Sequence, residues 1–172
     1  MNIRLATLAD IDAIMQLVKE VVPMMQATGN LQWDDHYPDA EVFTADVQAD
    51  QLWVADVDGH IAGVIAITLG QEPEYGQVPE WDINETAVVA HRLAVSPSMQ
   101  GKGIANSLLQ QCEVVARQKN IPLIRLDTNT VNRPMQNLFL KIGYHLGGEI
   151  TLHKKPGLKF MAFEKRLELQ SA

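Results

Sequence analysis

The fold of this chain is decided by residues 95–105, which read Val-Ser-Pro-Ser-Met-Gln-Gly-Lys-Gly-Ile-Ala. An apolar, strand-like run precedes this stretch, and apolar residues at helical spacing follow it. A glycine-rich turn between a strand and a helix directs backbone N–H groups outward, and the start of the helix adds partial positive charge. Lys102 adds a full charge. The sequence therefore predicts an anion site at this turn, typically for a phosphate group.

Two common phosphate-binding motifs do not fit this turn. A Walker A loop requires a glycine five residues before its Gly-Lys pair, and position 96 is a serine. A Rossmann fingerprint requires a third small residue three positions after Gly103, where this chain has Asn106. The pattern that does fit is Gln/Arg-x-x-Gly-x-Gly/Ala, which is supplied by Gln100, Gly103 and Ala105.

Strands and helices alternate on both sides of the turn. Asp58-Gly59 joins two β-branched apolar runs and predicts a hairpin, whereas the polar segment 71–84 reads as a long loop, which is often functional in a compact domain. The strand–helix–strand unit over 86–127 predicts two parallel strands joined by a right-handed crossover. This order predicts the α/β class, with a central mixed sheet and helices on both faces. We expect strands at 3–6, 52–57, 61–68, 86–95, 123–127, 144–152 and 159–164, and helices after the caps Thr7 (with Asp10) and Asp39, at 104–119 and from Pro134.

About thirty residues after the turn, residues 132–144 read Asn-Arg-Pro-Met-Gln-Asn-Leu-Phe-Leu-Lys-Ile-Gly-Tyr. Together with the glycine turn, this segment resembles the GNAT family of N-acetyltransferases. That family has an asparagine that opens a helix, and the helix ends in an aromatic-x-Lys-x-Gly-aromatic segment. The resemblance extends from about Ala87 to Lys165, nearly half of the chain. It implies the GNAT acyl-CoA N-acyltransferase fold.

The resemblance also implies that acetyl-CoA is the cofactor, held between two parallel strands that splay apart. Backbone groups of Leu93–Val95 would pair with its pantetheine arm, and the amides of Gln100–Ala105 would hold its pyrophosphate. Asn132 matches the family position that contacts the pantetheine end. Phe139 stands where the family often has a tyrosine near the sulfur as general acid, so we carry over no catalytic tyrosine. The expected cofactor contacts are Leu93, Ala94, Val95, Gln100, Gly101, Lys102, Gly103, Ile104, Ala105, Asn132 and Phe139.

The reaction implied by the resemblance is direct attack of an amine on the thioester. The amine must be neutral when it attacks, so a base or a proton-relaying water assists. A backbone N–H near Leu93 would stabilise the oxyanion. The candidate bases lie where the acceptor is expected to enter, and they are Glu85, Asp82, His91 and Asp127.

Each candidate base also has a structural interpretation. Glu85, just before the central strand, ranks first. His91 is either a base or a hydrogen-bonded structural histidine, and Asp127 is either a base or a residue that pins the neighbouring Arg125, Thr128 or Asn129 region. Alternation along a strand would place His91, Leu93 and Val95 on one face.

Aromatic residues mark two segments that could form a substrate wall. Trp33 and Tyr37 flank acidic residues, and acidic groups beside aromatic rings suit an ammonium ligand. The alternative interpretation is a lid in which these two rings are anchors packed on the core. Trp81 and Tyr75 in the long loop would close the other side. The expected substrate-binding residues are Trp33, Tyr37 and Trp81.

Length and composition limit the remaining possibilities. The chain has 172 residues, of which 47% are hydrophobic and 20% are charged, which predicts one globular domain over residues 1–172. A net charge of −7 argues against a nucleic-acid-binding protein. The longest apolar stretch, 61–69, is far shorter than the roughly 20 residues that span a bilayer, and we see no signal peptide.

The single cysteine, Cys112, excludes an internal disulfide and a multi-cysteine metal site, and we expect no metal. Its place on the apolar side of the helix at 104–119 predicts a core residue rather than a nucleophile. Cysteine usage favours a reducing compartment, so we expect a cytoplasmic protein.

The leading hypothesis is an N-acetyltransferase that moves the acetyl group of acetyl-CoA to a primary amine of a small molecule. Phe139 keeps open a second hypothesis, a non-catalytic acyl-CoA binding or sensing module. The third is a protein acetyltransferase that acts on an N-terminus or a lysine. A homodimer formed through the final strands is a further expectation, with neither a nucleic acid nor a membrane as partner.

Overall fold

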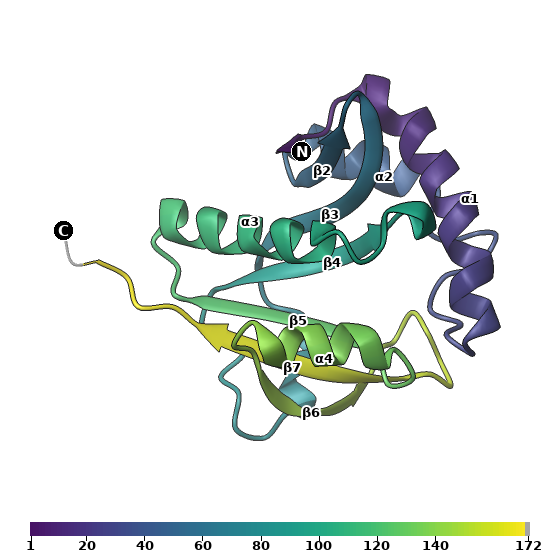
Figure 1. The fold of residues 1–172 in the computed structure, drawn as a ribbon. Coiled ribbons are helices and arrows are strands. Elements are labelled where there is room, and N and C mark those ends of the chain that lie inside the picture. Colours follow the sequence, from purple (N-terminus) through teal and green to yellow (C-terminus); the bar gives the residue numbers. More distant parts are fainter. Residues whose placement is uncertain (171–172) are drawn as a thin grey trace. The chain divides into compact units, whose positions relative to one another are not determined.

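The computed structural model describes residues 1–170, and its elements follow the predicted order (Figure 1). The strands are hydrogen-bonded in the order β1-β2-β3-β4-β5-β7-β6, and β4 and β5 run parallel. This mixed sheet confirms the predicted α/β class and the predicted parallel pair. No helix within residues 1–170 is long and apolar enough to cross a membrane. The strands are β1 (Asn2–Leu5), β2 (Leu52–Val57), β3 (His60–Gly70), β4 (Ala87–Val95), β5 (Leu123–Asn129), β6 (His145–Thr151) and β7 (Lys159–Arg166), and the helices are α1 (Ile11–Ala27), α2 (Ala40–Gln48), α3 (Ile104–Lys119) and α4 (Arg133–Lys141).

The chain divides into two compact units. Unit 1 comprises residues 1–67 and 91–111, and unit 2 comprises residues 68–90 and those from 112 onward. Strands β3 and β4 and helix α3 each contribute to both units.

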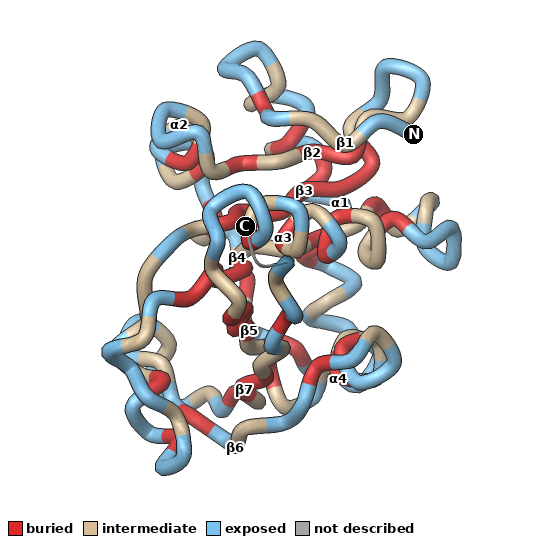
Figure 2. Tube along the Cα trace, turned by 90° about the vertical axis from the view of Figure 1, so that its left-hand side faces the viewer, coloured by how far each residue is buried: buried red, intermediate tan, exposed pale blue. Residues whose placement is uncertain are grey.

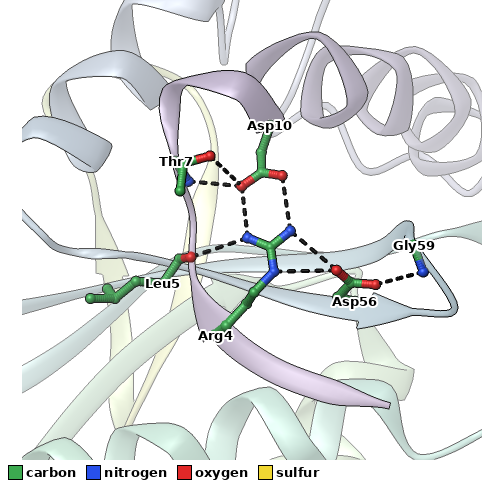
Figure 3. Close-up of polar contacts among 6 residues, drawn as sticks. All are labelled: Arg4, Leu5, Thr7, Asp10, Asp56 and Gly59. Atoms are coloured by element: carbon green, nitrogen blue, oxygen red, sulfur yellow. Dashed lines mark hydrogen bonds and ion pairs between the residues drawn. The ribbon is translucent and has the colours of Figure 1, made fainter.

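A polar network fixes the start of unit 1 (Figure 3). The Arg4 guanidinium donates to both carboxylate oxygens of Asp10, at 2.8 and 3.0 Å, and to Asp56 Oδ2 at 3.2 Å. The Thr7 backbone N–H donates to Asp10 Oδ2 at 2.8 Å. The predicted cap is therefore confirmed, although a short 3₁₀ turn over Leu8–Asp10 separates it from α1.

Helices pack on both faces of the sheet within unit 1. The apolar side of α1, together with Phe43 of α2, packs against one face of β2 and β3. On the other face, Gly63 makes room for α3, because a Cβ there would lie 2.9 Å from Ile104 Cγ2 and 3.0 Å from Leu108 Cδ1. Strand β3 is accordingly buried from Ala62 to Ile67 (Figure 2). The core on the first face contains Ile14, Leu17, Val18, Val21, Val22, Trp33, Phe43, Leu52, Val54, Val64, Ala66 and Ala94.

The predicted hairpin of unit 1 is confirmed. Asp58 and Gly59, which link β2 and β3, have φ values of 52° and 84°. Two consecutive residues with positive φ are what a type I′ turn requires. The Asp39 cap of α2 is confirmed as well, because its side chain accepts from the Val42 N–H at 2.9 Å.

In unit 2, different segments cover the two faces of the sheet. On one face α4 packs through Phe139, whose ring lies 5.3 Å from that of Phe163 on β7. On the other face lies segment 71–84, which contains a 3₁₀ helix, Pro73–Gln77. Segment 71–84, which was predicted to be a long loop, therefore packs against the sheet and covers one of its faces. It helps to form a cluster of Tyr75, Val78, Ala87, Val89, Leu123, Ile150, Phe160 and Ala162.

Strand β5 is longer than the sequence predicted, because it ends at Asn129 instead of Asp127. Thr128 and Asn129 are polar, and turn residues at this position favour the end of a strand. In the structure they pair with Met161 and Phe160 of β7. A partner strand that comes later in the chain therefore extends β5.

Candidate active site

The glycine turn of unit 1 leaves its backbone open to a ligand. Gly101 and Gly103 both have φ of 77°, and no atom lies within 4 Å of where their Cβ atoms would be. The Ser107 N–H donates to Gly103 O at 3.0 Å, so α3 begins immediately after Gly103. The first amides of a helix have no partner within it, and here residues 104–106 provide them. An exposed turn of this kind can bind an anion through backbone N–H groups.

Strand β4 leads into this turn with an irregular backbone. Arg92 has φ of 53°, in the left-handed region that non-glycine residues rarely adopt. The regular alternation predicted for residues 91–95 therefore does not hold at Arg92. Ala94 packs in the core of unit 1, whereas Leu93, Val95 and His91 are half-buried.

Arg92 also connects β4 to α2 and to the segment before it. Its guanidinium donates to both carboxylate oxygens of Asp46, at 2.8 and 2.7 Å, and to Tyr37 OH at 3.3 Å. Burial by itself lowers the pKa of Arg92, but the hydrogen bonds and charge of Asp46 and the contact with Tyr37 outweigh burial and raise it. The network fixes Tyr37 beside β4.

The two aromatic residues predicted as a substrate wall in unit 1 differ in exposure. Trp33 is only 3% exposed and lies in the core, because its indole fills space under α1 and α2. This burial supports the interpretation of Trp33 as an anchor and gives no support to its role in an open wall. Tyr37 remains half-buried.

In unit 2, segment 71–84 and strand β5 bring together four side chains of types that are common in binding and catalytic sites. They are Tyr75, Trp81, Arg125 and Asp127. The Tyr75 hydroxyl donates to Asp127 Oδ2 at 2.7 Å, and the Tyr75 ring meets the Trp81 ring edge-on at 5.5 Å. The Arg125 guanidinium lies 4.4 Å from the Trp81 ring and donates to Asp82 O at 2.9 Å. Burial, followed by the nearby Asp127 charge, raises the pKa of Tyr75 well above its ordinary value. The Tyr75 hydroxyl is therefore protonated, and it is the donor to the Asp127 carboxylate.

The first-ranked candidate base, Glu85, lies elsewhere in unit 2. The Arg166 guanidinium donates to both of its carboxylate oxygens, at 2.7 and 3.0 Å, and lowers its pKa. Arg166 lies opposite Leu123, at the amino end of β5. Asp127 lies four residues farther along β5, about 13 Å away at the usual rise of a strand. Glu85 and Asp127 are thus at opposite ends of the strand.

The parallel pairing of β4 and β5 covers Val88–Ala90 and Ile124–Leu126. Asp127 is the next residue on β5. In open α/β sheets, ligands bind beyond the carboxyl ends of parallel strands. In unit 2, Asp127 rather than Glu85 therefore lies at the carboxyl end of the paired strands.

Asn132 caps α4 and keeps spare hydrogen-bonding capacity. Its Oδ1 accepts from the Met135 N–H at 3.4 Å, and its Nδ2 donates to Thr128 Oγ1 at 3.1 Å. A side-chain amide can make up to four hydrogen bonds, so two remain. This half-buried residue can cap the helix and contact a ligand at once.

Phe139, which stands where a tyrosine could have been the general acid, lies in a buried region of unit 2. Phe139 is 2% exposed and contacts the rings of Tyr144 and Phe163, which supports a packing role for Phe139. The Tyr144 hydroxyl is buried without a hydrogen-bond partner among the described residues, and burial raises its pKa. Cys112 is fully buried, and burial raises its pKa to about 12, which confirms the prediction of a core thiol.

Two residues of these networks, Arg92 and Asp46, were not predicted as site residues, whereas Tyr75 was expected only to help close the substrate site. The first has a signal in the sequence, because an arginine within an apolar strand must find a partner when it is buried. Arg125 carries the same signal, and the structure gives it Glu164 as an ion-pair partner at 3.1 Å. Neither signal identifies the partner.

Comparisons with known proteins agree with this geometry. A GNAT-family acetyltransferase from Streptococcus agalactiae 2603 is 31% identical and covers 97% of this chain and 95% of its own, with a TM-score of 0.83. A Salmonella typhimurium protein described as an acetyltransferase, solved with its cofactor acetyl-CoA, is 20% identical over the whole of this chain and 96% of its own, with a TM-score of 0.71.

Among curated proteins, streptothricin acetyltransferase of Escherichia coli is 40% identical over 65 residues, which make up 38% of this chain. The match spans 37% of that relative's length. A family model described as "Acetyltransferase (GNAT) family" matches residues 16–144. The chain therefore belongs to the GNAT family of acetyltransferases.

Proposed function

We propose that this chain is an acetyl-CoA-dependent N-acetyltransferase whose acceptor is a primary amine of a small molecule. The observation that carries the proposal is the exposed turn at Gly101 and Gly103, at the start of a 16-residue helix in a GNAT-family chain. An open backbone at a helix N-terminus suits the pyrophosphate of a coenzyme A.

The residues present fit this cofactor. Amides at the start of α3 would bind the pyrophosphate, and the exposed Lys102 would add charge to this contact. The spare capacity of Asn132 and the backbone of Leu93–Val95 would bind the pantetheine arm. Acetyl-CoA supplies an acetyl group already activated as a thioester.

Asp127 is the proposed proton acceptor for the amine. It directly follows the paired part of β5 and takes a hydrogen bond from a neutral donor, Tyr75. Glu85 is less suited, because Arg166 lowers its pKa and makes it a weaker base. His91 is the alternative base. The Leu93 N–H is the proposed donor to the oxyanion.

No tyrosine of unit 2 is suited to protonate the departing thiolate. Tyr75 and Tyr144 are both buried, and burial raises the pKa of each. Phe139 has no acidic proton. Water is therefore the proposed proton source for this step, and no acid from unit 2 is required.

The acceptor class is proposed from the relative that acetylates streptothricin, which shares 40% identity over its matched stretch. A ribosomal-protein alanine acetyltransferase from Bacillus subtilis, with 24% identity, keeps a protein N-terminus as the alternative acceptor. A panel of small amines and N-terminal peptides, read by release of free thiol, distinguishes the two. If neither the small amines nor the peptides are acetylated, the non-catalytic acyl-CoA binding or sensing module is the hypothesis that is left.

The cofactor is tested by thermal melting with and without acetyl-CoA. At 100 times Kd the expected stabilisation is about 2.7 kcal/mol, a shift of roughly 5–10 °C for a chain of this length. Desulfo-CoA should keep most of the shift, whereas ATP should give little. Equal shifts with ATP and acetyl-CoA, or no shift with acetyl-CoA, would overturn the proposal.

Three further expectations belong to this proposal. The chain acts as one acetyltransferase domain over residues 1–172. The protein works in the cytoplasm. It forms a homodimer, which sedimentation at two concentrations would test.

A further inference from the structure

We infer that Tyr75 is a positioning residue: its hydroxyl holds the Asp127 carboxylate in the orientation in which that carboxylate accepts a proton from the acceptor amine. This inference rests on the proposed function and adds to it a residue outside the motifs of the sequence. It also gives segment 71–84 a role, because Tyr75 comes from that segment.

The contact is short and sheltered. Tyr75 OH lies 2.7 Å from Asp127 Oδ2, the tyrosine is 0% exposed, and the aspartate is half-buried. A hydrogen bond to a charged acceptor is about twice as strong as one between neutral groups. The donor is neutral, so the bond fixes the carboxylate without cancelling its charge.

The Tyr75 hydroxyl is itself held in place. Its ring lies in the cluster that covers one face of the sheet in unit 2, and the Trp81 ring meets it edge-on. Next to it, the Gln77 side chain both donates to Thr151 O, at 2.8 Å, and accepts from the Thr151 N–H, at 3.0 Å. Preorganised support of this kind is what keeps a reacting group in a productive geometry.

A buried cation, Arg125, lies two residues before Asp127. Arg125 is on the same face of β5, and its guanidinium donates to Glu164 Oε2 at 3.1 Å and to Asp82 O at 2.9 Å. The Trp81 ring stacks over it. Arg125 therefore has partners of its own in Glu164, Asp82 and Trp81.

The main test is Tyr75→Phe, which removes only the hydroxyl. We expect kcat to fall about tenfold, the size of one hydrogen bond to a charged group, with the KM for acetyl-CoA unchanged. The matched control is Tyr144→Phe, which removes a hydroxyl from another buried tyrosine of unit 2 whose hydroxyl has no hydrogen-bond partner among the described residues. Its kcat should stay within about twofold of the wild type.

Two further variants show whether Tyr75 acts through Asp127. In an Asp127→Asn background, Tyr75→Phe should change kcat less than about twofold, because residues that act as a unit are non-additive. Asp127→Glu keeps the carboxylate but shifts it by one methylene, and kcat should fall at least about tenfold. This second variant leaves Tyr75 intact and so serves if Tyr75→Phe does not fold.

The outcomes distinguish failure of the inference about Tyr75 from failure of the proposed function. A wild type that acetylates an amine, together with a Tyr75→Phe variant of unchanged kcat, overturns the inference and leaves the proposed function standing. Equal losses from Tyr75→Phe in both backgrounds, or full activity in Asp127→Glu, also overturn it. A wild type without turnover on any amine overturns the proposed function and this inference with it.

Discussion

Unit 2 holds two carboxylates at opposite ends of β5, and each has a hydrogen-bonding partner of a different kind. Glu85 faces the guanidinium of Arg166, which donates to both of its oxygens. Asp127 faces the hydroxyl of Tyr75, which donates to one. The first pair is charge-neutral as a whole, whereas the tyrosine leaves the aspartate charge in place.

This difference teaches that the partner decides what a carboxylate can do. A cation stabilises the ionised form, so the carboxylate becomes a weaker base. A neutral buried donor orients the carboxylate and leaves its charge to attract a cationic amine. Glu85 therefore resembles Asp10 of unit 1, which Arg4 holds in the same bidentate way (Figure 3).

The largest expected effect comes from removing each charge in turn. Asp127→Asn should lower kcat/KM on the order of 10²–10⁴-fold, the usual contribution of a general base. Glu85→Gln, the matched variant at the other end of the strand, should stay within about threefold. The measurement is the steady-state rate on one amine at saturating acetyl-CoA. A larger loss in Glu85→Gln would reverse the comparison and restore the ranking made from the sequence.

The cofactor site should respond independently of both carboxylates. Gly103→Val should raise the KM for acetyl-CoA about 10- to 100-fold, because a β-branched side chain resists φ of 77° and obstructs the turn. Gly157→Val is the control, since Gly157 of unit 2 has φ of 84° with open space around it and is not one of the expected cofactor contacts. Titration of acetyl-CoA measures both variants, and equal effects would mean that strain alone is responsible.

Acid sensitivity should follow the cation-paired carboxylates. Arg4, first by hydrogen bonding, lowers the pKa of Asp10 from 3.8 to about 2. The pair therefore stabilises the fold above about pH 4, and its contribution is lost as the pH falls through 2. After screening at this partly exposed site we expect about 1 kcal/mol at pH 7. Urea unfolding of wild type and Asp10→Asn at pH 7 and pH 2 measures it, and a difference that persists at pH 2 contradicts this account.

The smallest effect is the stability lost in Glu85→Gln. The Glu85 pKa is lowered by Arg166, so this pair contributes above the ordinary value of 4.5 and loses its contribution as the pH falls below it. Exposed pairs contribute at most about 1 kcal/mol. We expect a loss below that figure, further reduced in 0.5 M salt, measured by urea unfolding. A loss that salt does not change would show that Glu85 acts through packing.

The sequence predicted the elements well where the signal is local. The Thr7 and Asp39 caps, the Asp58-Gly59 hairpin and the start of α3 all follow from neighbouring residues. It predicted less where a distant partner decides. Strand β5 extends to Asn129 because β7 pairs with it, and Trp33 is buried because helices of unit 1 cover it.

The site shows the same division. The glycine turn could be predicted because two glycines, a lysine and the start of a helix lie next to one another in sequence. The role of Asp127 could not be separated from that of Glu85, because both carboxylates border apolar strands. The assignments of the cofactor and base residues are predictions that the variants above test.

The sequence alone determined the order of strands and helices, the exposed glycine turn and the family that the chain resembles, because these depend on interactions between near neighbours. The tertiary structure decided which charged side chain meets which partner. Tyr75 and Asp127 are 52 residues apart, and Glu85 and Arg166 are 81 apart. Side chains so distant meet only after the chain has folded, so their chemistry is a property of the packed sheet and its cover.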